Sequence, residues 1–192
     1  RLAIRRERVA VEENIEFIAA GKAISEAVKL IDEETENISI TVGKRLISFN
    51  IDGYLFISRL LEGEYVNYRQ ILPKSFATRV VLDLEPFRRC VDRASLIARE
   101  GNNNLLMLRI SGGEMVIEAH SQIGDVHEEL PIEQQGTDLN IAFNVKYLID
   151  VVRYIDADQI EINLNNAISP CIITPLNDPD YLHLVLPVRT AG

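Results

Sequence analysis

Three segments of the chain carry apolar residues at the spacing of an α-helix, and each is followed by runs in which apolar and polar residues alternate. The spacing predicts helices over residues 21–32, 85–100 and 144–156. In the first helix, Ile24, Val28 and Ile31 recur at i, i+4 and i+7 and predict one buried face. In the third, Asn144 stands where its side chain would cap the helix N-terminus.

The alternating runs predict three strands after each helix, with turn residues such as Asp52 and Gly53 between them. The predicted strands cover residues 37–42, 45–51, 54–60, 105–110, 114–120, 125–133, 159–164, 169–176 and 181–188. One further strand is expected before each helix, over residues 9–17, 80–85 and 139–143.

The predicted order is therefore strand, helix and three strands, and it occurs three times along the chain. Such a unit buries one face of its sheet under its helix, and two units can pair into a two-layer domain. We expect an α+β fold built from three units, which makes one and a half domains. The boundary is expected within VNYRQILPKS, residues 66–75, which we interpret as a hinge between domains.

The composition is that of a soluble globular protein, with 47% hydrophobic and 26% charged residues among 192. No apolar run approaches the roughly 20 residues that a membrane span needs. The sequence opens on Arg1 rather than on Met and shows no secretory signal pattern, so we expect a part of a longer, cytoplasmic protein. Cys90 and Cys171 lie among apolar neighbours and are expected to be buried, reduced thiols.

The net charge of −9 argues against nonspecific wrapping of nucleic acid by the whole surface. Basic residues nevertheless gather on the polar sides of the three predicted helices: Lys22, Lys29, Arg89, Arg93, Lys146 and Arg153. Either these side chains form a local surface that faces phosphates, or they are ordinary solvated helix faces.

Motifs for catalysis are missing from the sequence. It contains no glycine-rich phosphate loop and no nucleophile elbow. His120, His127 and His183 fall in strand-like runs without a helical i, i+4 partner, which makes metal ligation improbable. Asp83 and Glu85 would be the candidate carboxylates of a hydrolase, but they also suit the start of the second helix.

Four segments resemble, in order and spacing, successive signature segments of the bacterial sliding clamp family, the β subunit of DNA polymerase III. They are SRLLEGEYVNYRQILP, RASLIARE, FNVKYLIDVV and YLHLVLPVR, and the resemblance covers essentially the whole chain. It implies a head-to-tail homodimeric ring of three-domain protomers, with helices around a hole for duplex DNA. Residues 1–67 resemble the second half of the middle domain, and residues 68–192 resemble the third domain.

The resemblance implies an accessory subunit without cofactor or chemistry, whose partners are duplex DNA, the replicative polymerase, the clamp loader and other proteins with a clamp-binding motif. A hydrophobic pocket at the junction of the middle and third domains would bind their peptides. Carried over by position, the pocket residues are Arg1, Leu2, Val66, Gln70, Ile71, Asn144, Tyr147, Ile168, Pro170, Val185, Leu186, Pro187, Val188 and Arg189. The ring interface would use Leu96, Ile97, Glu128 and Glu129.

The chain departs from the family where Val66 and Gln70 replace a usual proline and arginine, so peptide preference is expected to differ. Without a first domain, we expect this chain not to close the native ring. A rival interpretation is an α+β interaction or small-ligand module with an incidental basic helix face. That rival needs no open apolar groove among Leu2, Tyr147 and Leu186.

Overall fold

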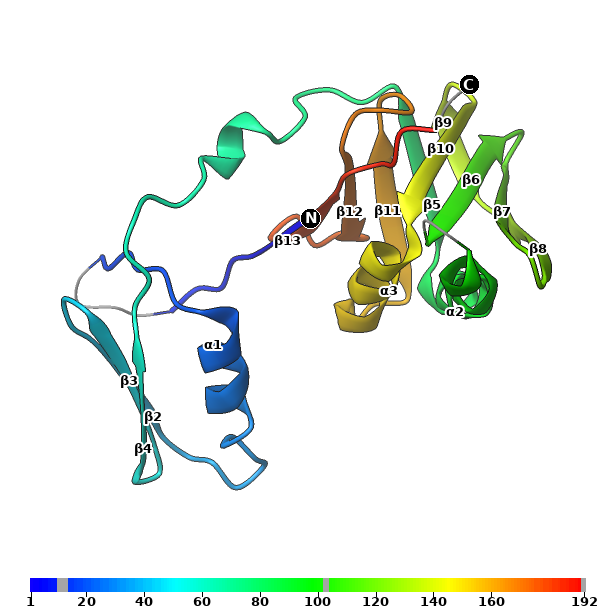
Figure 1. The fold of residues 1–192 in the computed structure, drawn as a ribbon. Coiled ribbons are helices and arrows are strands. Elements are labelled where there is room, and N and C mark those ends of the chain that lie inside the picture. The colour runs from blue at the N-terminus through cyan, green and yellow to red at the C-terminus, as the bar shows by residue number, and fades with distance from the viewer. Residues whose placement is uncertain (10–13, 102–103, 191–192) are drawn as a thin grey trace. The chain divides into compact units, whose positions relative to one another are not determined.

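The computed structural model describes residues 1–9, 14–101 and 104–190, which form two compact units. The larger unit combines Arg1–Arg8 with Arg69–Gly192, and the smaller unit is Val9–Tyr68. Figure 1 shows the helices and strands of each unit.

The larger unit holds two antiparallel sheets and two helices. Its six-stranded sheet has the order β1-β13-β12-β11-β5-β9, and its four-stranded sheet has the order β10-β6-β7-β8. The elements are β1 (Leu2–Arg5), η1 (Tyr68–Gln70, at the boundary), β5 (Thr78–Asp83), α2 (Leu84–Glu100), β6 (Leu105–Ser111), β7 (Glu114–Ser121), β8 (Gly124–Pro131), β9 (Glu133–Gly136), β10 (Leu139–Asn144), α3 (Val145–Tyr154), β11 (Gln159–Leu164), β12 (Cys171–Pro175) and β13 (Tyr181–Val185).

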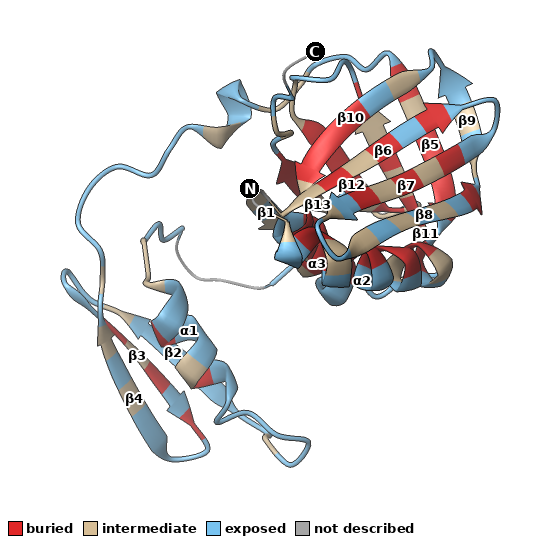
Figure 2. Cartoon of the chain, turned by 45° about the vertical axis from the view of Figure 1, so that its right-hand side comes forward, coloured by how far each residue is buried: buried red, intermediate tan, exposed pale blue. Residues whose placement is uncertain are grey.

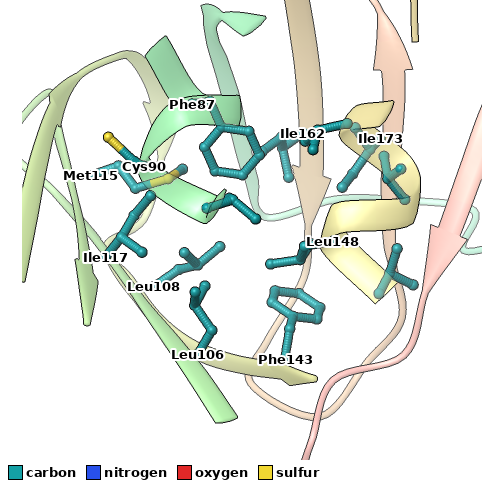
Figure 3. Close-up of a cluster of buried hydrophobic side chains, with 14 of the residues drawn as sticks. Phe87, Cys90, Leu106, Leu108, Met115, Ile117, Phe143, Leu148, Ile162 and Ile173 are labelled. Atoms are coloured by element: carbon teal, nitrogen blue, oxygen red, sulfur yellow. The ribbon is translucent and has the colours of Figure 1, made fainter. Parts of the chain in front are cut away.

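One hydrophobic core joins both sheets and both helices of the larger unit. Phe87 of α2, Leu108 of β6, Phe143 of β10 and Leu148 of α3 are all fully or almost fully buried in it (Figure 3). Both cysteines lie in this core as free thiols, which confirms the expected burial of Cys90 and Cys171.

The two helices of this unit are tied together through Arg88. Its Nε donates to the carbonyl of Val152 and its Nη2 to that of Ile155, both at 3.1 Å. These carbonyls lie at the C-terminal end of α3, where the last turn of a helix lacks partners and favours a cation. An arginine from α2 therefore caps α3.

One glycine is required by the close approach of β9 to the chain before β5. Gly136 has φ +97°, and a Cβ built on it would lie 1.9 Å from the Ala77 carbonyl oxygen. Any other residue would collide with backbone there, because only glycine combines a positive φ with the absence of a side chain.

Strand β1 was not expected from the sequence. Its four residues pair antiparallel with β13, so that Leu2 lies opposite Leu184 and Arg5 opposite Tyr181. The chain before the smaller unit thus supplies the edge strand of the larger unit's six-stranded sheet.

The smaller unit contains α1 (Gly21–Val28) and a three-stranded sheet of β2 (Ile38–Val42), β3 (Leu46–Ile51) and β4 (Tyr54–Arg59). The prediction for its helix was wrong in two respects. The helix ends at Val28, and its buried residues are Ala23 and Ala27. Ile24, Val28 and Ile31 are 38%, 56% and 41% exposed, whereas Ala27 packs with Ile47, Phe49 and Ile51 of β3. Figure 2 shows that most of the smaller unit is exposed.

Two predicted strands also differ from the structure. Of residues 9–17, positions 10–13 lie outside the described residues, and the others form no strand. Just after this segment, Ala19 forms an isolated antiparallel bridge with Leu60, the residue that follows β4. The run 125–133 divides into β8 and the first residue of β9, which belong to different sheets.

Candidate functional site

Three segments of the larger unit meet at the end of β13. Leu2 of β1 pairs with Leu184, and the Val188 N–H donates to the Ala142 carbonyl at 2.8 Å. The second bond places the chain after β13 beside β10, directly before α3. The residues 185–188 therefore run from the β1 side of the sheet to the start of α3.

The start of α3 presents one aromatic side chain beside this run. The Asn144 side chain caps the helix by accepting a hydrogen bond from the Lys146 N–H at 3.0 Å, as predicted. Tyr147, in the first turn, is 40% exposed, and Leu186 is 50% exposed. Val185, in contrast, is fully buried and serves the core.

The loop before β12 borders the same run. Cys171 pairs with Val185, so the antiparallel register carries Pro170 alongside Leu186. Ile168 in this loop is 61% exposed. Because directly opposite residues of neighbouring strands point to the same side of a sheet, Leu2 shares a face with the buried Leu184. Exposed aliphatic and aromatic groups thus border the end of β13.

The remaining predicted pocket residues lie around or apart from this region. Arg1 forms an ion pair with Asp150 of α3, and Arg189 is exposed. Pro187 and Val188 are half-buried. Gln70 ends η1 and Ile71 follows it, 48% exposed. Val66 is exposed but belongs to the smaller unit.

The predicted DNA-facing lysines and arginines differ in whether a carboxylate forms an ion pair with them. Lys29 pairs with Glu26 at 2.8 Å and Arg89 with Glu85 at 3.6 Å. In the part of the chain that the structure describes, no ion pair is found for Lys22, Lys146 or Arg153, all of which are exposed.

Arg93 is held by two hydrogen bonds to Glu128 of β8, from its Nε at 2.6 Å and its Nη2 at 2.7 Å. The Cys90 thiol lies beneath them, 3.6 Å from Glu128 and 3.3 Å from Arg93. The hydrogen bonds from Arg93 hold the pKa of Glu128 below its ordinary value. Desolvation raises the pKa of the Cys90 thiol, which makes it a poor nucleophile.

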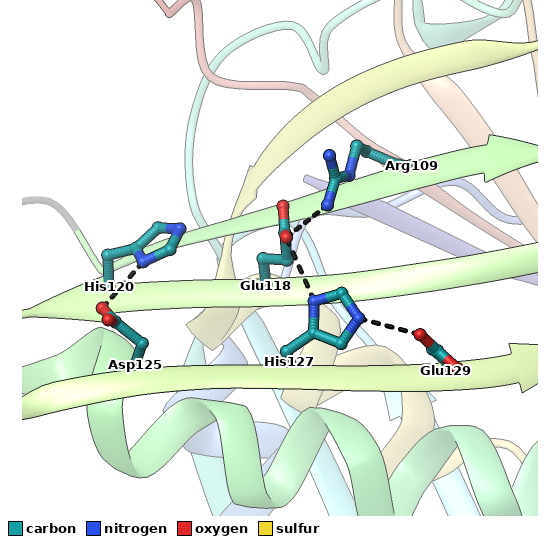
Figure 4. A network of polar contacts seen from close by, with 6 residues as sticks. All are labelled: Arg109, Glu118, His120, Asp125, His127 and Glu129. Atoms are coloured by element: carbon teal, nitrogen blue, oxygen red, sulfur yellow. Dashed lines mark hydrogen bonds and ion pairs between the residues drawn. The ribbon is translucent and has the colours of Figure 1, made fainter.

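The other predicted interface residues lie on or near β8, the edge strand of the four-stranded sheet. Leu96 on α2 is 66% exposed, whereas Ile97 is half-buried against the core. His127 Nε2 lies 3.0 Å from a carboxylate oxygen of Glu129, and its Nδ1 lies 3.2 Å from a carboxylate oxygen of Glu118 (Figure 4). These carboxylates, Glu129 first, raise the pKa of His127.

The two carboxylates considered for a hydrolase have separate partners. Asp83 accepts from the Gln159 amide at 3.0 Å, and Glu85 pairs with Arg88 at 2.7 Å. Among the described residues, no group of three His, Cys, Asp or Glu side chains is placed to hold a metal. None of the helices described is long and apolar enough to cross a membrane.

A cavity of about 470 Å³ that the sequence did not reveal lies at the C-terminal end of α3. It is lined by Arg5, Tyr154, Asp156, Pro175, Asp178 and Tyr181. Its residues come from strands, loops and a helix terminus without any shared periodicity. The pattern of apolar positions therefore offered no signal for it.

The fold and the site together define a class of α+β protein built from two units, with basic helix faces and an apolar region at the end of one sheet. The family model for the C-terminal domain of the DNA polymerase III beta subunit matches residues 69–189, and the model for the central domain of that protein matches residues 1–67. The chain belongs to the DNA polymerase III beta subunit family.

Individual relatives agree with this assignment. The beta sliding clamp of Staphylococcus aureus is 36% identical over 195 residues, which cover 99% of this chain and 51% of that protein. The sliding clamp of Bacillus subtilis superposes with a TM-score of 0.93 at 30% identity, over 98% of this chain and 51% of that one. The beta subunit of Thermotoga maritima gives 0.89 at 30% identity, over 98% and 52%. The chain thus spans about half the length of these relatives.

Proposed function

We propose that this chain acts as part of a DNA-replication processivity clamp, which binds partner peptides and tracks duplex DNA without performing chemistry. Family membership supports the proposal most directly, because its relatives are named beta sliding clamps. In this proposal residues 1–67 belong to the middle domain and residues 68–192 to the third domain.

The peptide site of the proposal is the region around the end of β13. Tyr147 and Leu186 supply exposed apolar surface where three segments converge. Asn144, Arg1 and Arg189 supply polar groups that can orient a peptide backbone or its side chains. A concave apolar surface with a few convergent polar groups is the usual form of such a site. The partners are the replicative polymerase, the clamp loader and other proteins with a clamp-binding motif.

Duplex DNA is the second partner, contacted through phosphates by lysines and arginines on the helices. Such contacts carry no sequence information and weaken as salt rises. In a closed homodimeric ring, topology holds the DNA, so weak contacts are sufficient and allow sliding. The exposed Lys22, Lys146 and Arg153 suit this role best, because their charges are unmatched within the described residues. The edge strand β8 with Leu96 would meet the partner protomer.

Binding of a fluorescein-labelled peptide of the Gln-Leu-x-Leu-Phe type, followed by fluorescence polarisation, tests the peptide site. We expect saturable binding by the unaltered protein and a loss of at least about tenfold in affinity for Tyr147→Ala and for Leu186→Asp, the range typical of central interface residues. Tyr54→Ala and Ile123→Asp are the matched controls, since these side chains are 69% and 70% exposed outside the proposed site.

Circular dichroism and thermal melting establish that all five proteins are folded before binding is measured. Equal loss in the control variants, or full binding by Leu186→Asp, would place the peptide elsewhere. Failure of the folded, unaltered protein to bind any such peptide would contradict the peptide-docking part of the proposal.

A further inference from the structure

The cavity at the C-terminal end of α3 already holds one guanidinium group, that of Arg5. Its Cζ lies 5.0 Å from the centroid of the Tyr181 ring, and its Nη1 donates to Asp178 at 2.7 Å. Its Nε donates to Glu7 at 2.6 Å. An aromatic face together with a carboxylate is a combination that selects planar cations.

A second tyrosine and a second aspartate line the same cavity. Tyr154 is 63% exposed, and Asp156 is also exposed. Within the described residues, the Asp156 carboxylate and the Tyr154 ring have no side-chain partner; only the Tyr154 carbonyl is used, by the Tyr181 hydroxyl at 3.0 Å. The cavity therefore contains two pairs of a tyrosine and an aspartate. Tyr181 and Asp178 hold Arg5, whereas Tyr154 and Asp156 hold no described side chain.

The charged residues that line the cavity favour a positively charged ligand. Arg5 is matched by two carboxylates, Asp178 and Glu7. Asp156 adds a negative charge that no described residue matches. An anionic ligand would thus meet net negative charge, whereas a lysine or arginine side chain would be attracted.

The cavity lies along α3 from the proposed peptide site. Tyr147, Asp150 and Tyr154 occupy positions i, i+3 and i+7, so they share one side of the helix. β1 runs beside this side, because Arg1 pairs with Asp150 and Arg5 lines the cavity with Tyr154. The seven residues from Tyr147 to Tyr154 span about 10 Å of helix. About three residues of extended peptide cover that distance.

We propose that the cavity is a subsite for a basic side chain of the peptide bound near Tyr147 and Leu186. This inference rests on the proposed function and extends it to specificity. The occupant is an arginine or lysine that lies about three to five residues outside the apolar motif. It stacks on Tyr154 and pairs with Asp156, as Arg5 does with Tyr181 and Asp178.

The test uses matched labelled peptides in fluorescence polarisation. Each peptide carries the apolar motif and one arginine, placed three or five residues before or after it, and its counterpart carries the neutral isostere citrulline. For at least one position, the arginine peptide should bind about three- to tenfold more tightly, a gain expected for one ion pair with one cation–π contact. The gain should shrink as salt rises from low ionic strength.

Variants of the protein test whether the tighter binding of the arginine peptides arises at this cavity. Asp156→Asn and Tyr154→Ala should each abolish most of the difference between arginine and citrulline peptides. Asp158→Asn, which changes an exposed carboxylate two residues away and outside the lining, should leave it intact.

The possible outcomes separate the subsite from the peptide site. Equal affinity of every arginine and citrulline pair overturns the subsite but leaves the peptide site standing. An arginine preference that persists in both cavity variants also overturns it, because the cation is then recognised elsewhere. If no peptide binds the folded protein, the proposed peptide site itself fails and the subsite fails with it.

Discussion

Glu128 on β8 accepts two hydrogen bonds from the guanidinium of Arg93 on α2, at 2.6 and 2.7 Å. The sequence places these residues on different predicted surfaces, Arg93 on the one that faces DNA and Glu128 on the ring interface. Their mutual pairing matches the charge of Arg93 within the protein. Both roles remain predictions, but the pairing ranks Arg93 below the unmatched cations as a phosphate contact.

DNA binding should therefore depend more on Lys146 than on Arg93. We expect Lys146→Ala and Arg153→Ala to weaken binding of a labelled duplex at low salt by about two- to fivefold each, as single phosphate contacts do. Arg93→Ala should change it little. Fluorescence anisotropy at several salt concentrations measures this, and a larger loss for Arg93→Ala than for Lys146→Ala would refute the ranking.

The stability of the larger unit should depend on the charge of Glu128. Arg93 lowers the pKa of this carboxyl in the folded protein. The stabilisation that ionised Glu128 gives the folded protein is complete above the ordinary glutamate pKa of about 4.3. It is lost as pH falls through the lowered pKa of the folded state. We expect Glu128→Gln to lower the melting temperature at pH 7 by a few degrees, and the difference from the unaltered protein to close as pH falls through the lowered pKa of Glu128. A difference that stays constant with pH would mean that packing, not charge, is responsible.

His127 should bind its proton more tightly than a free imidazole does. Glu129 and then Glu118 raise its pKa in the folded state. Its contribution to stability is therefore complete below the ordinary value of about 6.5 and is lost as pH rises through the raised one. An NMR titration of the ring protons should show a midpoint above 6.5 that falls in Glu129→Gln. A midpoint unchanged by that substitution would exclude the contact in solution.

His183 should show the opposite behaviour, because it is only 6% exposed and its Nε2 has no partner among the described residues. Desolvation, assisted by Arg1, lowers its pKa to about 4. Between pH 6.5 and 4 the unfolded chain binds a proton that the folded protein does not, so stability falls as pH falls. Urea denaturation should record a loss of about 1.5 kcal/mol from pH 6.5 to 5. A His183→Gln variant should lack this slope, and an equal slope in the variant would assign it to other groups.

The helices of the larger unit could be predicted because their apolar residues repeat with the helical period and face one core. Phe87 and Leu148 lie where that period places them. The same period misplaced the buried face of α1, where Ala23 and Ala27 meet the sheet and the larger residues do not. Which side of a helix is covered depends on the neighbouring layer, and the period alone does not contain that information.

Other features depend on contacts between distant parts of the chain. β1 is short and becomes a strand by pairing with β13, almost the whole chain away. The proposed peptide residues came from a family resemblance, since Tyr147 and Leu186 look like ordinary core positions in a periodic pattern. Arg93 and Glu128, 35 residues apart, gave no local sign of their pairing.

The origin of β1 has a consequence for how the two units are joined. Because Arg1–Arg8 belong to the larger unit and Val9–Tyr68 to the smaller one, the polypeptide crosses between them twice. A protease that cuts the chain once between Leu61 and Tyr68 divides it into two pieces, and the piece that carries the smaller unit then stays bound to the larger sheet through the noncovalent pairing of β1 with β13. Release of that piece requires β1 to leave the edge of the sheet, or a second cut between β1 and the smaller unit. The smaller unit is therefore an insertion held by a covalent connection on one side and by an edge strand on the other, so that after a single nick beyond Leu61 strand pairing replaces the covalent chain as its attachment.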